Sequence, residues 1–190
     1  MKQIRHFVNA NDSVKSLLVT FPVLLYTLFM QIRKTTAADI PAVMAIYAAA
    51  QDFMKTHGNP TQWGTFYPEQ SMIENDIHEG ISYVCTENGK LAATFAFKVG
   101  QDATYAQIYD GAWLNEKTYG VVHRIASARL VKGSARFCLA WAFSQCGNIR
   151  IDTHRDNLPM QHLLAEEGYT QCGIIHTYDG TERLAFQKSE

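Results

Sequence analysis

Two apolar runs on either side of Glu87-Asn88-Gly89 are the feature that most restricts how this chain can fold. Ile81–Thr86 precedes the tripeptide and Lys90–Val99 follows it. Asn-Gly is the strongest short signal for a β-hairpin, because both central residues of a type I′ turn need positive φ angles. The middle of the chain is therefore predicted to hold two neighbouring antiparallel strands, around which the rest of the fold must be built.

Helix and strand signals surround this hairpin. Before it, Asp39 as a cap with Pro41 in the first turn predicts the start of a helix that ends at Gly58. After it, apolar periodicities predict further strands and helices and a final hairpin turned at Asp179-Gly180. The expected elements are helices at 39–58, 68–80, 134–145 and 159–167, and strands at 31–36, 81–86, 90–99, 103–109, 119–127, 148–153, 173–179 and 181–188.

This order predicts one mixed α/β (α+β) domain at residues 30–190. The chain has 190 residues, of which 47% are hydrophobic and 18% are charged, so it can bury one ordinary globular core. Its 17 Lys and Arg residues nearly balance its 18 Asp and Glu residues, for a net charge of −1. No cationic surface large enough to coat nucleic acid is expected, which favours a small-molecule enzyme or a binding domain.

Residues 1–29 do not match the rest of the sequence. The apolar run Leu17–Met30 is shorter than the roughly 18 apolar residues that cross a bilayer. Basic residues precede it as in a signal peptide, but no small-residue cleavage site follows it. The run is a helix that packs on the domain or a partner, a weak membrane-surface anchor, or the result of a start codon assigned too early. We favour the last interpretation, in which Met30 is the true initiator and 1–29 belong to no domain.

The cysteines show no metal-binding pattern. No CxxC pair occurs and no histidine lies at zinc-finger spacing, so no metal site is expected. Scattered single cysteines are typical of reduced, mostly buried thiols in a cytoplasmic protein. The four residues are Cys85, Cys138, Cys146 and Cys172.

The segment Val121–Trp141 combines an apolar strand, a short loop and a helix. The loop Lys132-Gly133-Ser134-Ala135 enters the helix through small residues, and Arg136 follows it. Free amides at a helix N-terminus attract anions, and a glycine lets a ligand approach the backbone. The pattern is that of a diphosphate site. It is also that of a common tight turn, and the segment alone does not decide between the two.

A second polar loop lies downstream. Asn157 begins a helix after a strand that ends in charged residues, and Gly168-Tyr169 ends that helix. Together with the loop at 132–137 and the opening Ile32–Asp39, this combination resembles the GNAT superfamily of acyl-CoA-dependent N-acetyltransferases. The resemblance covers about residues 31–188. It implies a mostly antiparallel sheet with two splayed strands, flanked by about four helices, with pantetheine between those strands and the diphosphate on the following helix.

The resemblance also implies roles for individual residues. The backbone of Ile125-Ala126-Ser127 would hydrogen-bond the pantetheine arm, and Asn157 would meet the cofactor near the second splayed strand. The family's Arg/Gln-x-x-Gly-x-Gly/Ala loop falls on Lys132-Gly133-Ser134-Ala135-Arg136-Phe137, where Lys, Ala and Phe replace the usual types. The tyrosine that in many members protonates the leaving thiolate is Leu164 here. The identity of the general acid therefore stays open.

Acetyl transfer to an amine needs a base that takes a proton from the attacking ammonium, and a polarised thioester carbonyl. His123 is the first candidate for the base, because it lies on the strand that lines the expected acyl site and histidine titrates near neutral pH. A hydrogen-bonded core histidine would show the same pattern. Asp152 and His154 share one strand face and form either a carboxylate–imidazole pair or a contact that fixes the strand end.

Aromatic residues are candidates for the acceptor pocket. Trp63 and Tyr67 lie on the loop between the first two helices, and Tyr109 and Trp113 lie in a later polar loop. Such side chains are as often core or lid packing as substrate contacts. Three acids in the second helix, including Asp76, are interpreted as a solvated face and not as a polyamine or aminoglycoside site. The acceptor is therefore not identified.

The sequence predicts a transferase that moves an acetyl group from acetyl-CoA to a primary amine of a small molecule, peptide or protein by direct attack. The alternative is a regulatory or interaction domain that binds acyl-CoA and has lost catalysis, which the missing tyrosine and the degenerate loop favour. No metal, nucleic acid or membrane partner is expected, and the expected location is the cytoplasm. The aromatic residues and the final hairpin are compatible with a homodimer.

Overall fold

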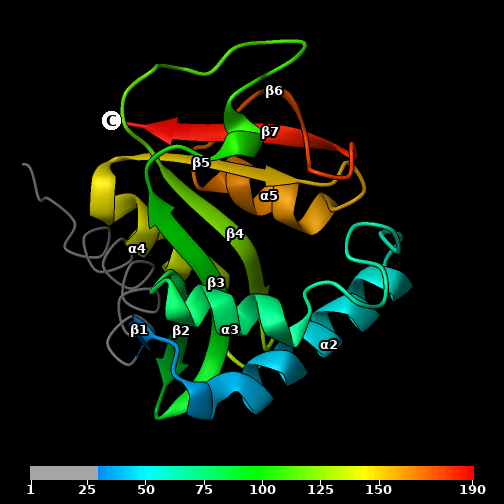
Figure 1. Cartoon of the computed structure of the whole chain (residues 1–190), viewed down its shortest axis with the longest axis vertical. Coiled ribbons are helices and arrows are strands. Elements are labelled where there is room, and N and C mark those ends of the chain that lie inside the picture. The colour runs from blue at the N-terminus through cyan, green and yellow to red at the C-terminus, as the bar shows by residue number, and fades with distance from the viewer. Residues whose placement is uncertain (1–29) are drawn as a thin grey trace, which may run out of the picture.

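Seven strands form one sheet in the order β1-β2-β3-β4-β5-β7-β6 (Figure 1). The computed structural model describes residues 30–190, and the interpretations of residues 1–29 lie outside this range. The strands are β1 (Met30–Lys34), β2 (Ser82–Glu87), β3 (Lys90–Val99), β4 (Gly120–Ser127), β5 (Asn148–Thr153), β6 (Thr170–His176) and β7 (Glu182–Ser189). The helices within the described range are α2 (Ile40–Thr56), α3 (Gln70–His78), α4 (Ser134–Cys146) and α5 (Leu158–Glu166), with 3-10 turns η1 (Ala37–Asp39) and η2 (Ala103–Tyr105).

The mixed, mostly antiparallel fold predicted from the sequence is confirmed. The central hairpin forms at the Asn-Gly signal, where Asn88 has φ 51° and Gly89 has φ 76°. β2 and β3 pair antiparallel from Ser82 to Glu87. Among residues 30–190, no helix is both long and apolar enough to cross a membrane.

The strand expected at 103–109 does not form. Asp102 instead caps the turn η2, because its Oδ1 accepts hydrogen bonds from the backbone N–H and the hydroxyl of Thr104, at 3.0 and 2.7 Å. Such a local cap gives the backbone an alternative to a sheet ladder. Only Tyr109 pairs, in a single bridge with Ile174. The prediction of a strand was wrong because it followed the apolar alternation of the segment and did not consider the Asp102 side chain as a cap.

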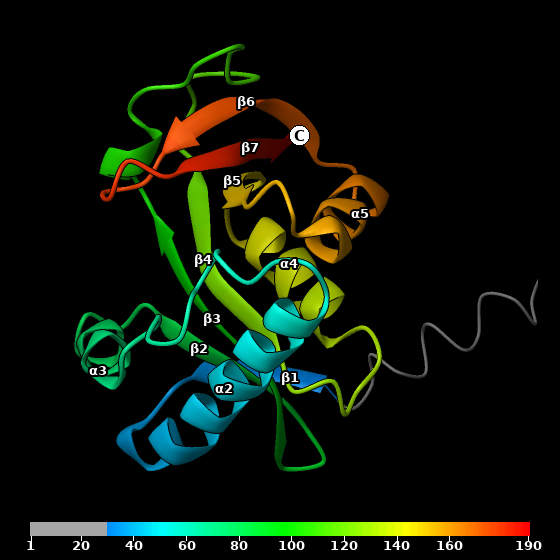
Figure 2. The same ribbon diagram turned by 90° about the vertical axis from the view of Figure 1, so that its right-hand side faces the viewer.

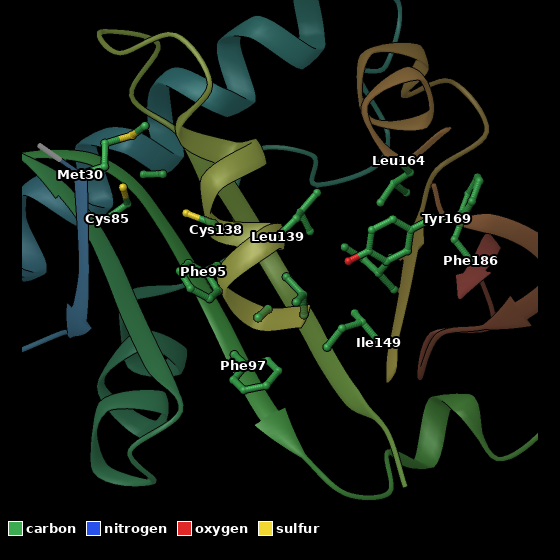
Figure 3. Packing of buried hydrophobic residues seen from close by; sticks show 14 of the residues in the cluster. Met30, Cys85, Phe95, Phe97, Cys138, Leu139, Ile149, Leu164, Tyr169 and Phe186 are labelled. Carbon is green, nitrogen blue, oxygen red and sulfur yellow. The ribbon is translucent and has the colours of Figure 1, made fainter. Parts of the chain in front are cut away.

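The helices cover the two faces of the sheet. Figure 2 shows α2 and α3 on one side of the central strands and α4 and α5 on the other. α4 and α5 bury the larger cluster, in which Figure 3 shows Leu139, Ile149, Leu164 and Tyr169 packed together. α2 and α3 bury a smaller cluster on the opposite face. Its buried members are Val43, Ile46, Tyr47, Ile73, Val84 and Ala126.

β4 and β5 are the parallel neighbours, and they separate soon after they meet. Their pairing consists of Gly120 with Ile149 and Val121 with Arg150. Beyond these positions β4 stays paired with β3 as far as Ser127, and β5 stays paired with β7 as far as Thr153. The sheet is therefore continuous at one end and open at the other, which is the splay that the family resemblance implies.

A buried amide network fixes the point at which the two strands meet. Gln187 on β7 is 0% exposed, and its Oε1 accepts a hydrogen bond from the backbone N–H of Leu114 at 2.8 Å. Its Nε2 donates to Oδ1 of Asn148, the first residue of β5, at 2.7 Å. Asn148 in turn donates to the carbonyl oxygen of Thr118 at 3.1 Å. The network thus ties the segment that enters β4 to β5 and β7.

Gln187→Met is expected to lower the free energy of unfolding by about 2–3 kcal/mol, because it leaves the backbone N–H of Leu114 and the buried Oδ1 of Asn148 without their partners. Urea unfolding followed by circular dichroism measures the change. The matched control is Gln145→Met, since Gln145 is exposed and bonds only within α4. A loss no larger than that of the control would show that the network does not stabilise the junction.

Candidate active site

A cleft of about 740 Å³ opens where β4 and β5 diverge. Its floor includes Val121–Ile125 of β4, and Ile151–Thr153 of β5 form part of the facing wall. α3 and the loop 58–69 close one side, and the turn between β6 and β7 contributes residues 177–179. Charged and aromatic side chains from segments far apart in the sequence therefore meet in one open cleft.

A β-bulge in β4 turns two consecutive side chains into this cleft. His123 is opposite Ala96 and Ala126 is opposite Thr94, so two β4 residues fit where β3 has one. Arg124, the first of the two, has a φ of 52°. In a regular strand the neighbours His123 and Arg124 would face opposite sides of the sheet. The bulge instead lets both line the cleft.

His123 is held by an acidic partner. Its Nε2 lies 3.0 Å from Oδ2 of Asp102, and Nζ of Lys98 lies 3.0 Å from the same oxygen. Burial opposes ionisation of Asp102, but hydrogen bonds from His123, Thr104 and Lys98 outweigh it and hold the pKa of the carboxyl well below its usual range. Asp102 is therefore a carboxylate that accepts a hydrogen bond from the histidine ring.

Arg124 is paired with an acid from α3. Its Nη2 donates to Oδ2 of Asp76 at 2.5 Å, and the two side chains are 12% and 7% exposed. Burial raises the pKa of the Asp76 carboxyl, although the charge of Arg124 opposes the shift. The interpretation of the α3 acids as a solvated face was wrong for Asp76, which faces the cleft, while its neighbours Glu74 and Glu79 are exposed.

Asp152 and His154 do not form the pair expected from their spacing. Asp152 accepts a hydrogen bond from the Tyr105 hydroxyl at 2.7 Å, and its Oδ2 lies 4.0 Å from Nε of Arg183. The ring of His154 lies 3.5 Å from the Asp156 carboxylate. Burial, followed by the nearby charge of Arg183, lowers the pKa of His154. Asp152 lines the cleft, and His154 fixes the turn after β5.

Asn157 caps α5 as predicted and also anchors the loop 58–69. Its Oδ1 accepts a hydrogen bond from the backbone N–H of Met160 at 3.2 Å, and its Nδ2 donates to Oε1 of Gln62 at 2.9 Å. The carbonyl oxygen of Gln62 accepts a hydrogen bond from Arg183 on β7 at 3.3 Å. The loop is thereby tied to the β5–α5 side of the opening.

The expected diphosphate loop lies at the N-terminus of α4. Gly133 precedes the helix with a φ of 85°, a conformation that glycine adopts without strain. Ser134 and Ser127 share a hydrogen bond of 2.9 Å between their hydroxyls, which joins the helix start to the end of β4. Lys132 is exposed, whereas Arg136 is engaged by Glu166 and Glu167.

Of the remaining residues predicted to bind the cofactor, one lines the cleft and two lie in the core. Ile125 lines the cleft, while Ala126 is buried against α2 and α3 and Phe137 packs against the larger core cluster. Leu164, at the position of the family's tyrosine, is 0% exposed and points into the core beside Tyr169 (Figure 3). No acid can therefore act from position 164.

The aromatic candidates divide in the same way. Trp63 and Tyr67 line the cleft, and Trp63 packs edge-on against Tyr47 with ring centroids 5.7 Å apart. Tyr109 and Trp113 are not among the cleft-lining residues. Tyr109 packs on His176, and the indole of Trp113 donates to the carbonyl oxygen of Tyr105 at 3.2 Å. The structure therefore does not bring the two aromatic pairs together.

Six charged residues of the cleft are absent from the sequence-based candidates for the site. The spacing of Asp102 and Thr104 was a usable signal, because an Asp two residues before a Thr often caps a turn. Arg124 gave no signal, since only the bulge turns it to the same side as His123. Among residues 30–190, no group of three or more His, Cys, Asp or Glu side chains could hold a metal ion. The six charged residues are Asp76, Lys98, Asp102, Arg124, Asp179 and Arg183.

Neither a sequence model of a protein family nor a protein of curated function matches the chain. Solved structures do match. A GNAT-family acetyltransferase from Streptococcus agalactiae is 35% identical, with a TM-score of 0.68, and the match covers 85% of this chain and 95% of that one. This chain belongs to the GNAT family of acetyltransferases.

More distant GNAT-like structures share the fold. A ribosomal-protein-alanine N-acetyltransferase from Brucella melitensis is 17% identical over 84% of this chain and 99% of its own, with a TM-score of 0.56. An acetyltransferase from Salmonella typhimurium, solved with its cofactor acetyl-CoA, is 18% identical over 84% of this chain and 93% of its own, with a TM-score of 0.54. The GNAT fold recognised from the sequence is therefore confirmed.

Asp102→Asn is expected to lower the free energy of unfolding by about 2 kcal/mol at neutral pH, because the buried carboxylate loses its charge-assisted hydrogen bonds. The pKa of Asp102 is lowered in the folded protein. The stabilisation that its carboxylate provides is therefore complete above the unfolded-state pKa of about 4, and it is lost as the pH falls toward the folded-state pKa. The difference between wild type and variant should therefore shrink below about pH 4.

Urea unfolding of both proteins across this pH range makes the measurement. Asp52→Asn is the matched control, since Asp52 is exposed on α2 and forms no side-chain bond in the described range. A difference that stays constant with pH would contradict the low pKa assigned to Asp102.

Proposed function

We propose that this GNAT-family protein transfers an acetyl group from acetyl-CoA to a primary amine of a small molecule or peptide, with His123 as the general base. The observation that carries the proposal is the bond between His123 Nε2 and the buried Asp102 carboxylate, 3.0 Å long, on the floor of the cleft between the splayed strands. An oriented imidazole at the opening between β4 and β5 is suited to receive a proton from a bound ammonium.

The donor side of the proposal rests on the splay. Beyond Val121 and Arg150, β4 and β5 no longer pair with each other. The backbone groups on their facing edges are therefore available to the amides of a pantetheine arm. The N-terminus of α4 then meets the diphosphate through its free amides and Lys132. The Salmonella neighbour solved with acetyl-CoA supports this choice of donor.

Asp102 determines which ring nitrogen of His123 acts. A carboxylate only accepts hydrogen bonds, so Nε2 carries the hydrogen and Nδ1 keeps the lone pair. Nδ1 would take a proton from the acceptor ammonium, and the free amine would attack the thioester carbonyl. Backbone N–H groups of the bulged strand would stabilise the oxyanion, and the bond to sulfur would then break.

The buried Leu164 is compatible with this route. A thiol has an ordinary pKa of about 8.5, so a thiolate leaves with less help from an acid than an alkoxide would need. The same leucine is the observation that favours the second candidate function, a domain that binds acyl-CoA without catalysis. The assays below distinguish the two, because only the enzyme releases free thiol in the presence of an amine.

His123→Gln is expected to lower kcat for acetyl transfer by about a hundredfold, which is within the usual contribution of a general base. Release of CoA thiol with a panel of amines measures the rate, and calorimetric titration with CoA shows whether the donor site is intact. His162→Gln is the matched control, because His162 is exposed on α5. A rate equal to that of the control would remove His123 from the mechanism.

Ala135→Asp is expected to raise the KM for acetyl-CoA by about tenfold or more, because it places a negative charge where the diphosphate would meet α4. An acid near a helix N-terminus favours the helix itself, so the free energy of unfolding should not fall. Initial rates at varied acetyl-CoA provide the measurement. The control Ala140→Asp carries the same charge on the exposed middle of α4, and an equal KM in both variants would place the diphosphate elsewhere.

A further inference from the structure

The guanidinium of Arg124 has donor capacity that the folded chain does not use. An arginine offers five N–H donors in a fixed plane; Nη2 bonds the Asp76 carboxylate here, and the Tyr67 hydroxyl also interacts with the guanidinium and raises its pKa. Nε of Arg124 is buried and has no hydrogen-bond partner among the described residues. A buried polar atom without a partner is costly, so the folded chain leaves this cleft-lining guanidinium incompletely bonded.

The other cations of the cleft are already engaged. Lys98 lies 3.0 Å from Asp102, and Arg183 donates to backbone carbonyls of Glu182 and Gln62 at 3.1 and 3.3 Å. Arg124 is therefore the cleft cation, within the described range, that carries a buried N–H without a partner. It is the best placed of the three to receive an anionic group from a ligand.

Its place in the chain puts that anionic group beside the reacting amine. His123 and Arg124 are consecutive residues, and the bulge turns both into the same cleft. In an α-amino acid a single carbon atom separates the ammonium from the carboxylate. A ligand whose ammonium faces His123 can therefore present its carboxylate to the neighbouring guanidinium.

Part of the cleft wall near Arg124 is apolar or aromatic. Met72 lies one helical turn before Asp76 on the cleft side of α3, and Trp63 and Tyr67 of the loop 58–69 line the same space. Such a wall fits an apolar or aromatic substituent.

We propose that the acceptor is a small zwitterion of the α-amino acid class with an apolar side chain, whose carboxylate binds Arg124 while its ammonium faces His123. The inference rests on the proposed acetyl transfer and names its substrate class. Asp76 is a positioning residue in this account, since it holds the guanidinium on the cleft floor. The transfer forms the amide C–N bond and breaks the thioester C–S bond. Of the two protons that the ammonium nitrogen loses, one passes to His123 and the other to the departing thiolate, which gives an N-acetyl amino acid and free CoA.

The wild-type protein provides the first test. Apolar and aromatic L-amino acids are offered as acceptors, each as the free acid and as its carboxamide, with acetyl-CoA as donor. We expect kcat/KM to be about tenfold higher or more for the acids, because a carboxylate that forms a bidentate pair with arginine binds more strongly than a neutral carboxamide does. The amine of an amino acid carboxamide is less basic than that of the free acid, so a larger fraction of it is unprotonated at neutral pH. A preference for the acid therefore cannot come from the reactivity of the amine.

Variants of Arg124 provide the second test. Arg124→Lys keeps the charge but loses the planar fork, and Arg124→Met loses both. Each should raise KM for the free acids by about tenfold or more and bring the acid-to-carboxamide ratio close to one. Arg33→Lys is the matched control, because Arg33 forms a comparable pair with Asp39 outside the cleft. If Arg124→Met does not fold, the double variant with Asp76→Asn removes the unpaired acid.

Each outcome decides a different claim. Equal kcat/KM for acids and carboxamides in the wild type would overturn the substrate class and leave acetyl transfer standing. A preference for acids that persists in a folded Arg124→Met protein would overturn the role of the arginine. Absence of thiol release with every amine, including those without a carboxylate, would remove the proposed function and this inference with it.

Discussion

The early end of the parallel pairing between β4 and β5 is the constraint on which the rest of the structure depends. The strands pair at Gly120–Ile149 and Val121–Arg150 and then separate, which leaves two strand edges facing an open space. Edges without partners are costly unless a ligand or water satisfies them. The amide network around Gln187 fixes the junction at one end, and α4 begins near the other, so the opening has a defined position.

The bulge in β4 gives this opening its chemistry. Without it His123 and Arg124 would face opposite sides of the sheet, and one would enter the core. With it the pair reaches Asp102 and Asp76 on two separate segments. A base and an anion receptor thus stand side by side, and each is oriented by a buried carboxylate.

Local signals predicted most of the fold, and long-range contacts account for the misses at Asp76 and Arg124. The Asn88-Gly89 turn, the cap at Asn157 and the glycine before α4 act over a few residues, so the sequence displays them. The strand predicted at 103–109 does not form, because Asp102 caps a turn there despite the apolar alternation of the segment. Asp76 was interpreted as part of a solvated face and Arg124 was not a candidate, because their meeting depends on a bulge and on the docking of α3, which no local pattern shows. Asp152 lies on β5 and bonds to Tyr105 far along the chain, whereas His154 follows the strand and contacts Asp156 in the next turn.

The central claim is that the splay between β4 and β5 holds the acetyl donor with its reacting end beside His123. A crystal structure of the protein with CoA tests this claim most directly. The account predicts a pantetheine arm between the two strands, a diphosphate at the N-terminus of α4 and a thiol that opens onto the space shared by His123 and Arg124. A pantetheine arm bound outside the splay, or a thiol on the far side of the sheet from His123, would contradict it.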